Sequence, residues 1–166
     1  MKTGGRRFLG SKERKVFLTQ FFSAFKIDLA EVFGDKQLIE QMVLQKNTEV
    51  YFINSAPVLI KIDEGFVPAL VSDVVLNRLP RVVVDMGAIP KICNGADVMA
   101  PGIVSIQGSF NSGLIIAITD EKHGKFIAVG KALVDSDELK STKSGKAVKN
   151  LHYIGDDLWR LIKNLH

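Results

Sequence analysis

The chain has 166 residues, of which 46% are hydrophobic, and a formal net charge of +4 at pH 7. This length allows one domain or two small ones with filled cores. Cys93 is the single cysteine, which excludes an intrachain disulfide. No apolar run approaches the roughly 20 residues of a membrane-spanning helix, and the N-terminal residues lack the hydrophobic segment of a secretory signal. We therefore expect a cytoplasmic protein without a membrane partner.

Positive charge is concentrated toward the two ends of the sequence. Residues 1–20 hold six basic side chains and one acidic one, and residues 121–166 hold nine and six. If these segments lie close together they form one basic surface, which attracts nucleic acid; otherwise the lysines only keep the protein soluble. The N-terminal side chains assigned to an accessory basic surface are Arg6, Arg7, Lys12, Arg14 and Lys15.

The first 79 residues predict a small domain that mixes helices and strands. A short strand at 6–9 precedes a helix that has Ser11 as its N-cap and an apolar stripe containing Phe17, Phe21 and Phe25. Apolar runs predict strands at 38–39, 42–44, 50–53 and 58–62. Pro68 fits the first position of a further helix, which continues to residue 79. Strands in hairpin order beside helices indicate an antiparallel sheet with helices packed on one face.

From residue 81 the pattern changes to short strands separated by glycine turns. Strands are expected at 82–85, 98–99, 103–107, 114–119, 126–134 and 148–154. Short helices interrupt them at 87–93, at 136–141, where Asp135 and Glu138 have capping-box spacing, and at 156–160. Trp159 is expected to pack in the core, because apolar residues surround it. The expected fold class is α+β, with an N-terminal α+β domain over residues 1–79 and a compact β-barrel over 80–166.

The segment 82–103 contains small residues wherever the backbone must turn or let a ligand come close. Glycine accepts positive φ values and leaves its main-chain N–H accessible. A site for RNA needs such open amides, cations for phosphate, and surfaces on which bases stack. Lys91, Asn94 and Met99 supply these groups within the segment, and Lys146, Lys149 and His152 lie on or next to the last expected strand.

The stretch VDMGAIPKICNGADVMAPGI, which spans residues 84–103, resembles the signature of the PUA domain, a small RNA-binding β-barrel. The resemblance continues through 130–132, 145–148 and 150–153 and covers roughly residues 81–160. Residues ahead of it resemble the N-terminal domain of archaeal PUA proteins related to ligatin and the malignant T-cell-amplified-sequence proteins. The resemblance implies an RNA site on the segment 87–102 and the last strand, with these contacts: Gly87, Ala88, Lys91, Asn94, Gly95, Ala96, Met99, Ala100, Pro101, Gly102, Lys146, Lys149 and His152.

Three functions stay open at this point. The resemblance implies a non-catalytic protein without cofactor or metal that binds structured RNA such as tRNA or rRNA. Its role would lie in translation or RNA maturation, with the ribosome or a SUI1-type translation factor as a further partner. The alternative is an RNA-modifying enzyme or its accessory subunit, since Asp85 and Asp97 could form an acid–base pair, although turn aspartates more often bind backbone N–H groups. The third is a protein-interaction module.

Overall fold

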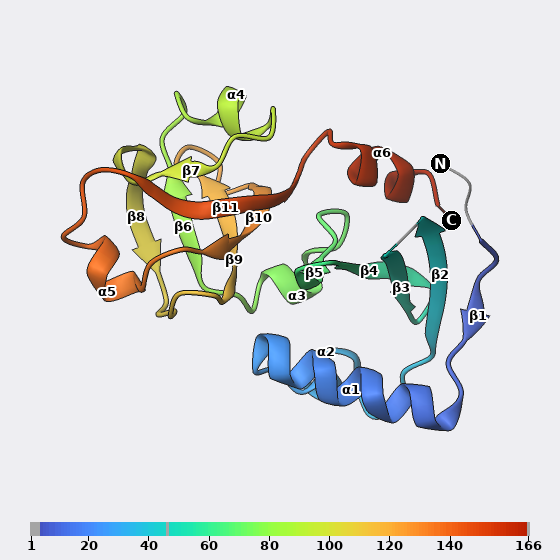
Figure 1. Ribbon diagram of the computed structural model, residues 1–166. Helices are drawn as coiled ribbons and strands as arrows, with labels where there is room; N and C mark the ends of the chain where they lie inside the picture. The colour runs from blue at the N-terminus through green and yellow to red at the C-terminus, as the bar shows by residue number, and fades with distance from the viewer. Residues whose placement is uncertain (1–3, 46, 166) are drawn as a thin grey trace.

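The computed structural model describes residues 4–45 and 47–165 (Figure 1). Its N-terminal part is built on a five-stranded antiparallel sheet, which confirms the expected hairpin order. The strands are β1 (Arg7–Phe8), β2 (Ile39–Gln45), β3 (Thr48–Ile53), β4 (Ala56–Ile62) and β5 (Gly65–Pro68). The helices are α1 (Ser11–Phe25), α2 (Leu29–Phe33) and α3 (Asp73–Leu76).

Two predicted helix starts in this part are wrong. Helix α1 is capped at Gly10 instead of Ser11, because the Gly10 N–H donates to Oε1 of Glu13 at 3.0 Å. Pro68 ends strand β5, where it pairs with Leu59, and the next helix is limited to α3. The apolar residues that follow Pro68 are buried because the chain continues along β4, not because they form one face of a long helix.

The second part is a six-stranded mixed sheet that curls into a half-barrel, with strand order β7-β11-β10-β9-β6-β8. Its strands are β6 (Arg81–Val84), β7 (Val98–Met99), β8 (Ile103–Gln107), β9 (Ile115–Asp120), β10 (Phe126–Ala132) and β11 (Lys146–Tyr153). Short helices α4 (Ile89–Ile92) and α5 (Ser136–Leu139), the 3-10 turn Ala100–Gly102 and helix α6 (Asp157–Lys163) complete the chain. The expected barrel-like unit of short strands is thus confirmed.

Strands β10 and β11 approach each other closely at Gly130. The pairing shifts register between Val129 and Gly130, and again on β11 between Lys146 and Val148. A Cβ atom at position 130 would lie 2.4 Å from the carbonyl oxygen of Lys149. Only glycine therefore fits there without moving a strand, and each irregularity changes which side chains of β11 face the interior.

Helices cover both faces of the N-terminal sheet, whereas the sequence predicts helices on one face only. Aromatic residues of α1, among them Phe17 and Phe21, pack against Tyr51 on one face. The other face is covered by α6, whose Ile162 packs among Met42, Val50 and Phe52. Figure 1 shows α6, red, returning from the second part of the chain to lie over the first sheet.

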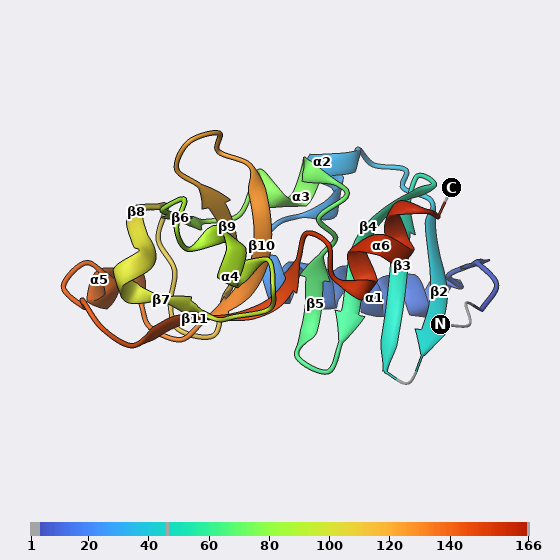
Figure 2. The ribbon, with the colours of Figure 1, turned by 90° about the horizontal axis from the view of Figure 1, so that it is seen from above.

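The two halves of the chain share buried surface. Val75 and Leu79 of the first part belong to the same core cluster as Ile115, Ala117 and Val129 of the second. The view from above shows the curled sheet and the first sheet side by side, with α6 on the first (Figure 2). The division of the chain into domains between residues 79 and 80 stays a prediction. Side chains pack across it, since Val75 and Leu79 join a cluster with the second part and α6 covers the first sheet.

Candidate nucleic-acid interface

A cavity of about 670 Å³ lies beside α4, and we refer to its lining as the α4 site. The site brings together nine residues predicted to contact RNA: Gly87, Ala88, Lys91, Gly95, Ala96, Met99, Pro101, Gly102 and Lys146. Asp85, Ile92 and Asp97 complete the lining, and Ile92 is a buried residue that the sequence did not mark for this site. That these residues contact RNA stays a prediction.

Short-range hydrogen bonds shape the α4 site. At the end of β6 the Asp85 N–H donates to the Gly102 carbonyl at 2.9 Å, which brings the segment 85–88 against the 3-10 turn. Oδ1 of Asp85 accepts the Ala88 N–H at 2.9 Å and so fixes the turn into α4. Gly95 has a φ of +97°, which other residues rarely adopt, and a Cβ atom at this position would lie 3.4 Å from the Tyr153 hydroxyl. Gly87 on one side of α4 and Gly95 and Ala96 on the other are exposed, while the N–H groups of Gly95 and Ala96 donate to the carbonyls of Ile92 and Lys91.

Two exposed lysines, Lys91 and Lys146, and two carboxylates, Asp85 and Asp97, set the charge of the site. Nζ of Lys146 lies 3.2 Å from Oδ2 of Asp97, and Oδ1 of Asp97 accepts the Asn150 N–H at 2.9 Å. The Asn150 N–H above all, and Lys146 in addition, outweigh partial burial and lower the pKa of Asp97. Asp97 is therefore ionised at neutral pH and partly offsets Lys146, whereas Lys91 is exposed.

Four predicted contact residues lie outside the cavity. His152 is only 1% exposed, and Ala100 is buried, so neither side chain is available to RNA and both predictions are wrong. Nζ of Lys149 pairs with Oε1 of Glu64 at 3.0 Å, and Lys146, not Lys149, shares the cavity with Lys91. Asn94 is exposed and lines a neighbouring depression of about 370 Å³ together with Arg160, which the sequence analysis had not singled out.

The buried His152 connects the two parts of the chain. Its Nε2 accepts the Leu70 N–H at 3.2 Å, and its Nδ1 lies 2.7 Å from Oδ2 of Asp156. Asp156 in turn caps α6 by accepting the Trp159 N–H at 2.7 Å. His152 is therefore a structural residue between the first part of the chain and α6.

The accessory basic surface is mostly engaged in internal contacts. Arg6 pairs with Glu40 at 2.9 Å, Arg7 with Glu13 at 2.6 Å, and Nη1 of Arg14 donates to the Gln37 carbonyl at 2.6 Å. Lys12 and Lys15 are exposed, but they lie on α1, on the side of the molecule away from α4 (Figure 1). The N-terminal cations and the α4 site thus do not form one continuous basic surface.

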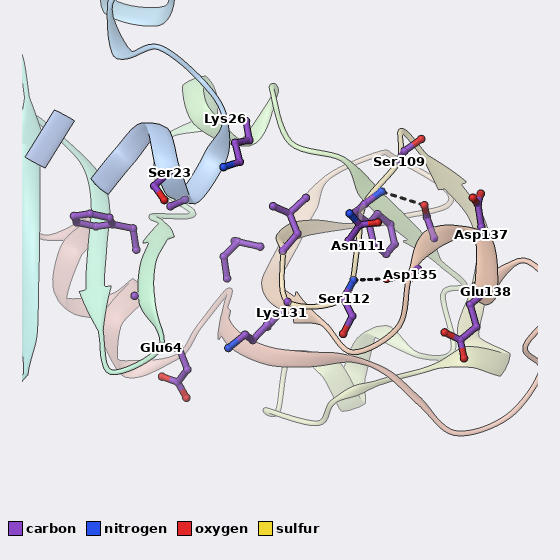
Figure 3. A pocket seen from close by; sticks show the side chains of 18 residues that line it. Ser23, Lys26, Glu64, Ser109, Asn111, Ser112, Lys131, Asp135, Asp137 and Glu138 are labelled. Atoms are coloured by element: carbon purple, nitrogen blue, oxygen red, sulfur yellow. Dashed lines mark hydrogen bonds between the residues drawn. The ribbon is translucent and has the colours of Figure 1, made fainter. Parts of the chain in front are cut away.

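A second cavity, of about 660 Å³, has a more acidic lining than the α4 site (Figure 3). It lies where the end of α1 and the β4–β5 turn face the loop before β9 and helix α5. Its charged lining consists of four carboxylates and two lysines: Glu64, Asp135, Asp137, Glu138, Lys26 and Lys131. An excess of carboxylates repels phosphate, so among these two cavities the α4 site is the better place for RNA.

In residues 4–45 and 47–165, no helix has the length and hydropathy that crossing a membrane requires.

Comparison with known proteins places the α4 site within a described domain type. Residues 80–154 match the model of the PUA domain. An uncharacterized protein of Methanocaldococcus jannaschii is 36% identical over 162 residues, which cover 96% of this chain and 98% of that protein. Translation machinery-associated protein 20 of Schizosaccharomyces pombe is 28% identical over 156 residues, covering 89% of this chain and 85% of that protein.

A solved structure agrees with these relatives. The crystal structure of a PUA domain from Aeropyrum pernix, a tartrate complex, is 27% identical and superposes with a TM-score of 0.87, covering 99% of this chain and 93% of that chain. The agreement extends over both parts of the chain, including the N-terminal sheet that precedes the PUA match. The chain therefore belongs to the family of PUA-domain proteins that includes translation machinery-associated protein 20 and malignant T-cell-amplified sequence 1.

Proposed function

We propose that this protein binds structured RNA, such as tRNA or rRNA, at the α4 site and acts in translation without catalysing a reaction itself. The observation that carries the proposal is the arrangement of the α4 site, in which exposed small residues on both sides of α4 line one cavity with Lys91 and Lys146. The membership in a family with translation machinery-associated relatives supports the biological role.

The chemistry of the α4 site fits a ribose-phosphate chain. Lysines bind phosphate and position the RNA, whereas base contacts give specificity. Lys91 and Lys146 supply the charge, and the side chain of Met99, 45% exposed, supplies an apolar surface for an unpaired base. Small residues at 87–88 and 95–96 allow the RNA backbone to approach the protein backbone closely.

The proposed role is that of a binding protein, because the candidate acid–base pair is engaged in structure. Asp85 accepts the Ala88 N–H, and Asp97 accepts the Asn150 N–H and pairs with Lys146. These are the turn and strand contacts expected of structural aspartates. Incubation of the protein with tRNA should therefore produce no altered nucleoside, and a new nucleoside in the digest would favour the enzyme alternative.

The ribosome or a SUI1-type translation factor is the protein partner that this proposal includes. The acidic cavity of Figure 3 and the α4 site have no lining residue in common, and the acidic cavity repels RNA. A partner protein could therefore bind the molecule while RNA occupies the α4 site.

A salt titration of tRNA binding tests the proposal. The change is Lys91→Gln together with Lys146→Gln, and the matched control is Lys12→Gln together with Lys15→Gln, which removes equal charge from exposed positions on α1. Each lost phosphate contact reduces the slope of log K against log salt by about 0.7–0.9, so the site variant should lose about 1.5 in slope and bind at least tenfold more weakly. Equal losses in both double variants would contradict the site, since they would reflect net charge alone.

A further inference from the structure

A groove of about 770 Å³ lies where α6 meets the turn before β10 and the segment that leads into α3. We call it the α6 groove. Leu70, Phe126 and Trp159 form part of its apolar wall, and Asn77, Lys125 and Lys163 bring polar groups to it. The groove lies outside the α4 site, and α6 begins after the last residue of the PUA match.

The side chains of the α6 groove match the chemistry of a nucleotide. Trp159 packs against a core cluster, as the sequence predicts, but it is only half-buried, and Nζ of Lys163 lies 4.4 Å from the centre of its ring. Within the described part of the chain, neither Lys125 nor Lys163 forms a salt bridge. An aromatic ring beside cations is the combination with which proteins stack a base and hold its phosphate.

Charge separates this groove from the acidic cavity of Figure 3. The α6 groove has two lysines and one carboxylate in its lining, that of Asp73. The acidic cavity has two lysines and four carboxylates. The α6 groove therefore attracts an anionic ligand, and the acidic cavity repels one.

Helices α4 and α6, beside which the α4 site and the α6 groove lie, are on the same side of the molecule. Figure 2 looks onto the side that carries both α4 and α6. The depression lined by Asn94 and Arg160 lies between them, and it includes Leu158, the neighbour of Trp159. Helix α6 is fixed there by Asp156, which caps it and bonds to His152. An RNA seated at the α4 site can therefore continue past Asn94 and Arg160 to the α6 groove.

We propose that the α6 groove is a second contact for the same RNA and holds an unpaired nucleotide, with its base against Trp159 and its phosphate beside Lys125 and Lys163. This assignment rests on the proposed RNA binding at the α4 site and extends it beyond the PUA match. Lys163 occupies the ring face that the base would take, so its ammonium group turns from the ring to the phosphate on binding.

The fluorescence of Trp159 gives a direct test, because it is the single tryptophan of the chain. Dye-labelled tRNA is titrated with the intact protein, and anisotropy of the dye is recorded beside tryptophan emission. A base stacked on the indole quenches its emission, so we expect quenching that follows the anisotropy curve. Lys125→Gln with Lys163→Gln should weaken binding about tenfold and reduce the salt slope by about 1.5, whereas Lys12→Gln with Lys15→Gln should change little.

Variants at Trp159 separate stacking from folding. Trp159→Phe keeps an aromatic face and should bind tRNA nearly as well as the original protein, whereas Trp159→Leu keeps apolar volume without the face and should bind about tenfold more weakly. Circular dichroism and thermal unfolding establish that both variants fold. Equal affinity of the two variants would overturn stacking on this residue.

The outcomes distinguish this proposal from the proposed function. One outcome is that the α4 variant binds tRNA more weakly, tRNA leaves tryptophan emission unchanged, and the Lys125/Lys163 variant binds tRNA with the original affinity. In that case the α6 groove is not an RNA contact and the α4 site stands. If tRNA does not bind at low salt, the proposed function fails and the groove assignment fails with it. If an acidic peptide with apolar side chains quenches Trp159 and tRNA does not, the groove is a protein site and the proposal is wrong.

Discussion

Replacement of His152 by alanine should strongly destabilise the fold. The imidazole is 1% exposed and lies between the backbone of Leu70 and the carboxylate of Asp156. Because Nε2 accepts the Leu70 N–H, the ring proton is on Nδ1, which donates to Asp156. One side chain thereby links the first part of the chain to the cap of α6.

The expected loss is about 3–5 kcal/mol. Without the imidazole the buried Leu70 N–H has no acceptor, which costs about 1–3 kcal/mol. The lost hydrogen bond to a carboxylate contributes about 1.5–3 kcal/mol more, although Asp156 keeps its backbone donors, Tyr153 at 2.9 Å and Trp159 at 2.7 Å. A total stability of about 5–15 kcal/mol is typical of a domain, so the loss is a large share of it.

Urea unfolding at neutral pH measures this loss, with His123→Ala as the matched control. His123 lies in an exposed turn, so its replacement should change the free energy of unfolding by less than about 0.5 kcal/mol. His152→Gln retains an amide oxygen and should recover part of the loss if that oxygen reaches the Leu70 N–H. A loss below about 1 kcal/mol for His152→Ala would refute the reasoning.

Three further predictions follow from local contacts. Gly130→Ala should lower the free energy of unfolding by about 2–4 kcal/mol in urea titrations, because its Cβ would meet a β11 carbonyl oxygen at 2.4 Å; Gly5→Ala, with open space around it, should be nearly neutral and is the control. Asp97→Asn keeps an acceptor for the backbone but releases Lys146, so tRNA should bind about threefold to tenfold more tightly in anisotropy titrations, with a steeper salt dependence; weaker binding with an intact fold would contradict this role. Burial raises the pKa of Asp156, but its hydrogen bonds from the neighbouring imidazole and from backbone N–H groups outweigh burial and lower it. Its stabilising effect is therefore complete above the unfolded pKa of about 3.9 and is lost as pH falls through the lower folded pKa, so unfolding from pH 6 to 3 should show a flatter decline for Asp156→Asn.

The sequence could predict the segment 82–103 because its signals are local. A β-branched run, small residues at the turns and a proline-containing turn each depend on neighbours only a few positions away, and β6, α4, β7 and the 3-10 turn all lie where such signals place them. Nine of the predicted contact residues accordingly line one cavity. The sequence signal for this cavity is the run of small residues at the turns on both sides of α4.

The errors have a different origin, since they depend on partners far away in the sequence. Asp135 does not form the predicted capping box, because its carboxylate accepts the Ser112 N–H at 2.7 Å. Lys149 and His152 of β11 were both predicted to contact RNA, although regular alternation places them on opposite faces; the register shift that lies beside His152 is the one opposite Val129 and Gly130, and His152 faces inward. The contact of Lys149 with Glu64 joins residues 85 positions apart, which no local pattern reveals.

The return of α6 to the first sheet has a consequence for the order in which the protein matures during synthesis. Met42, Val50 and Phe52 leave the ribosome more than a hundred residues before Ile162, which covers them. Throughout that interval the nascent sheet exposes an apolar face that attracts chaperones or other unfinished chains. A product cut after residue 154 would retain the whole PUA match. It would still be prone to aggregate, because the missing segment contains α6, which covers an apolar face of the N-terminal sheet.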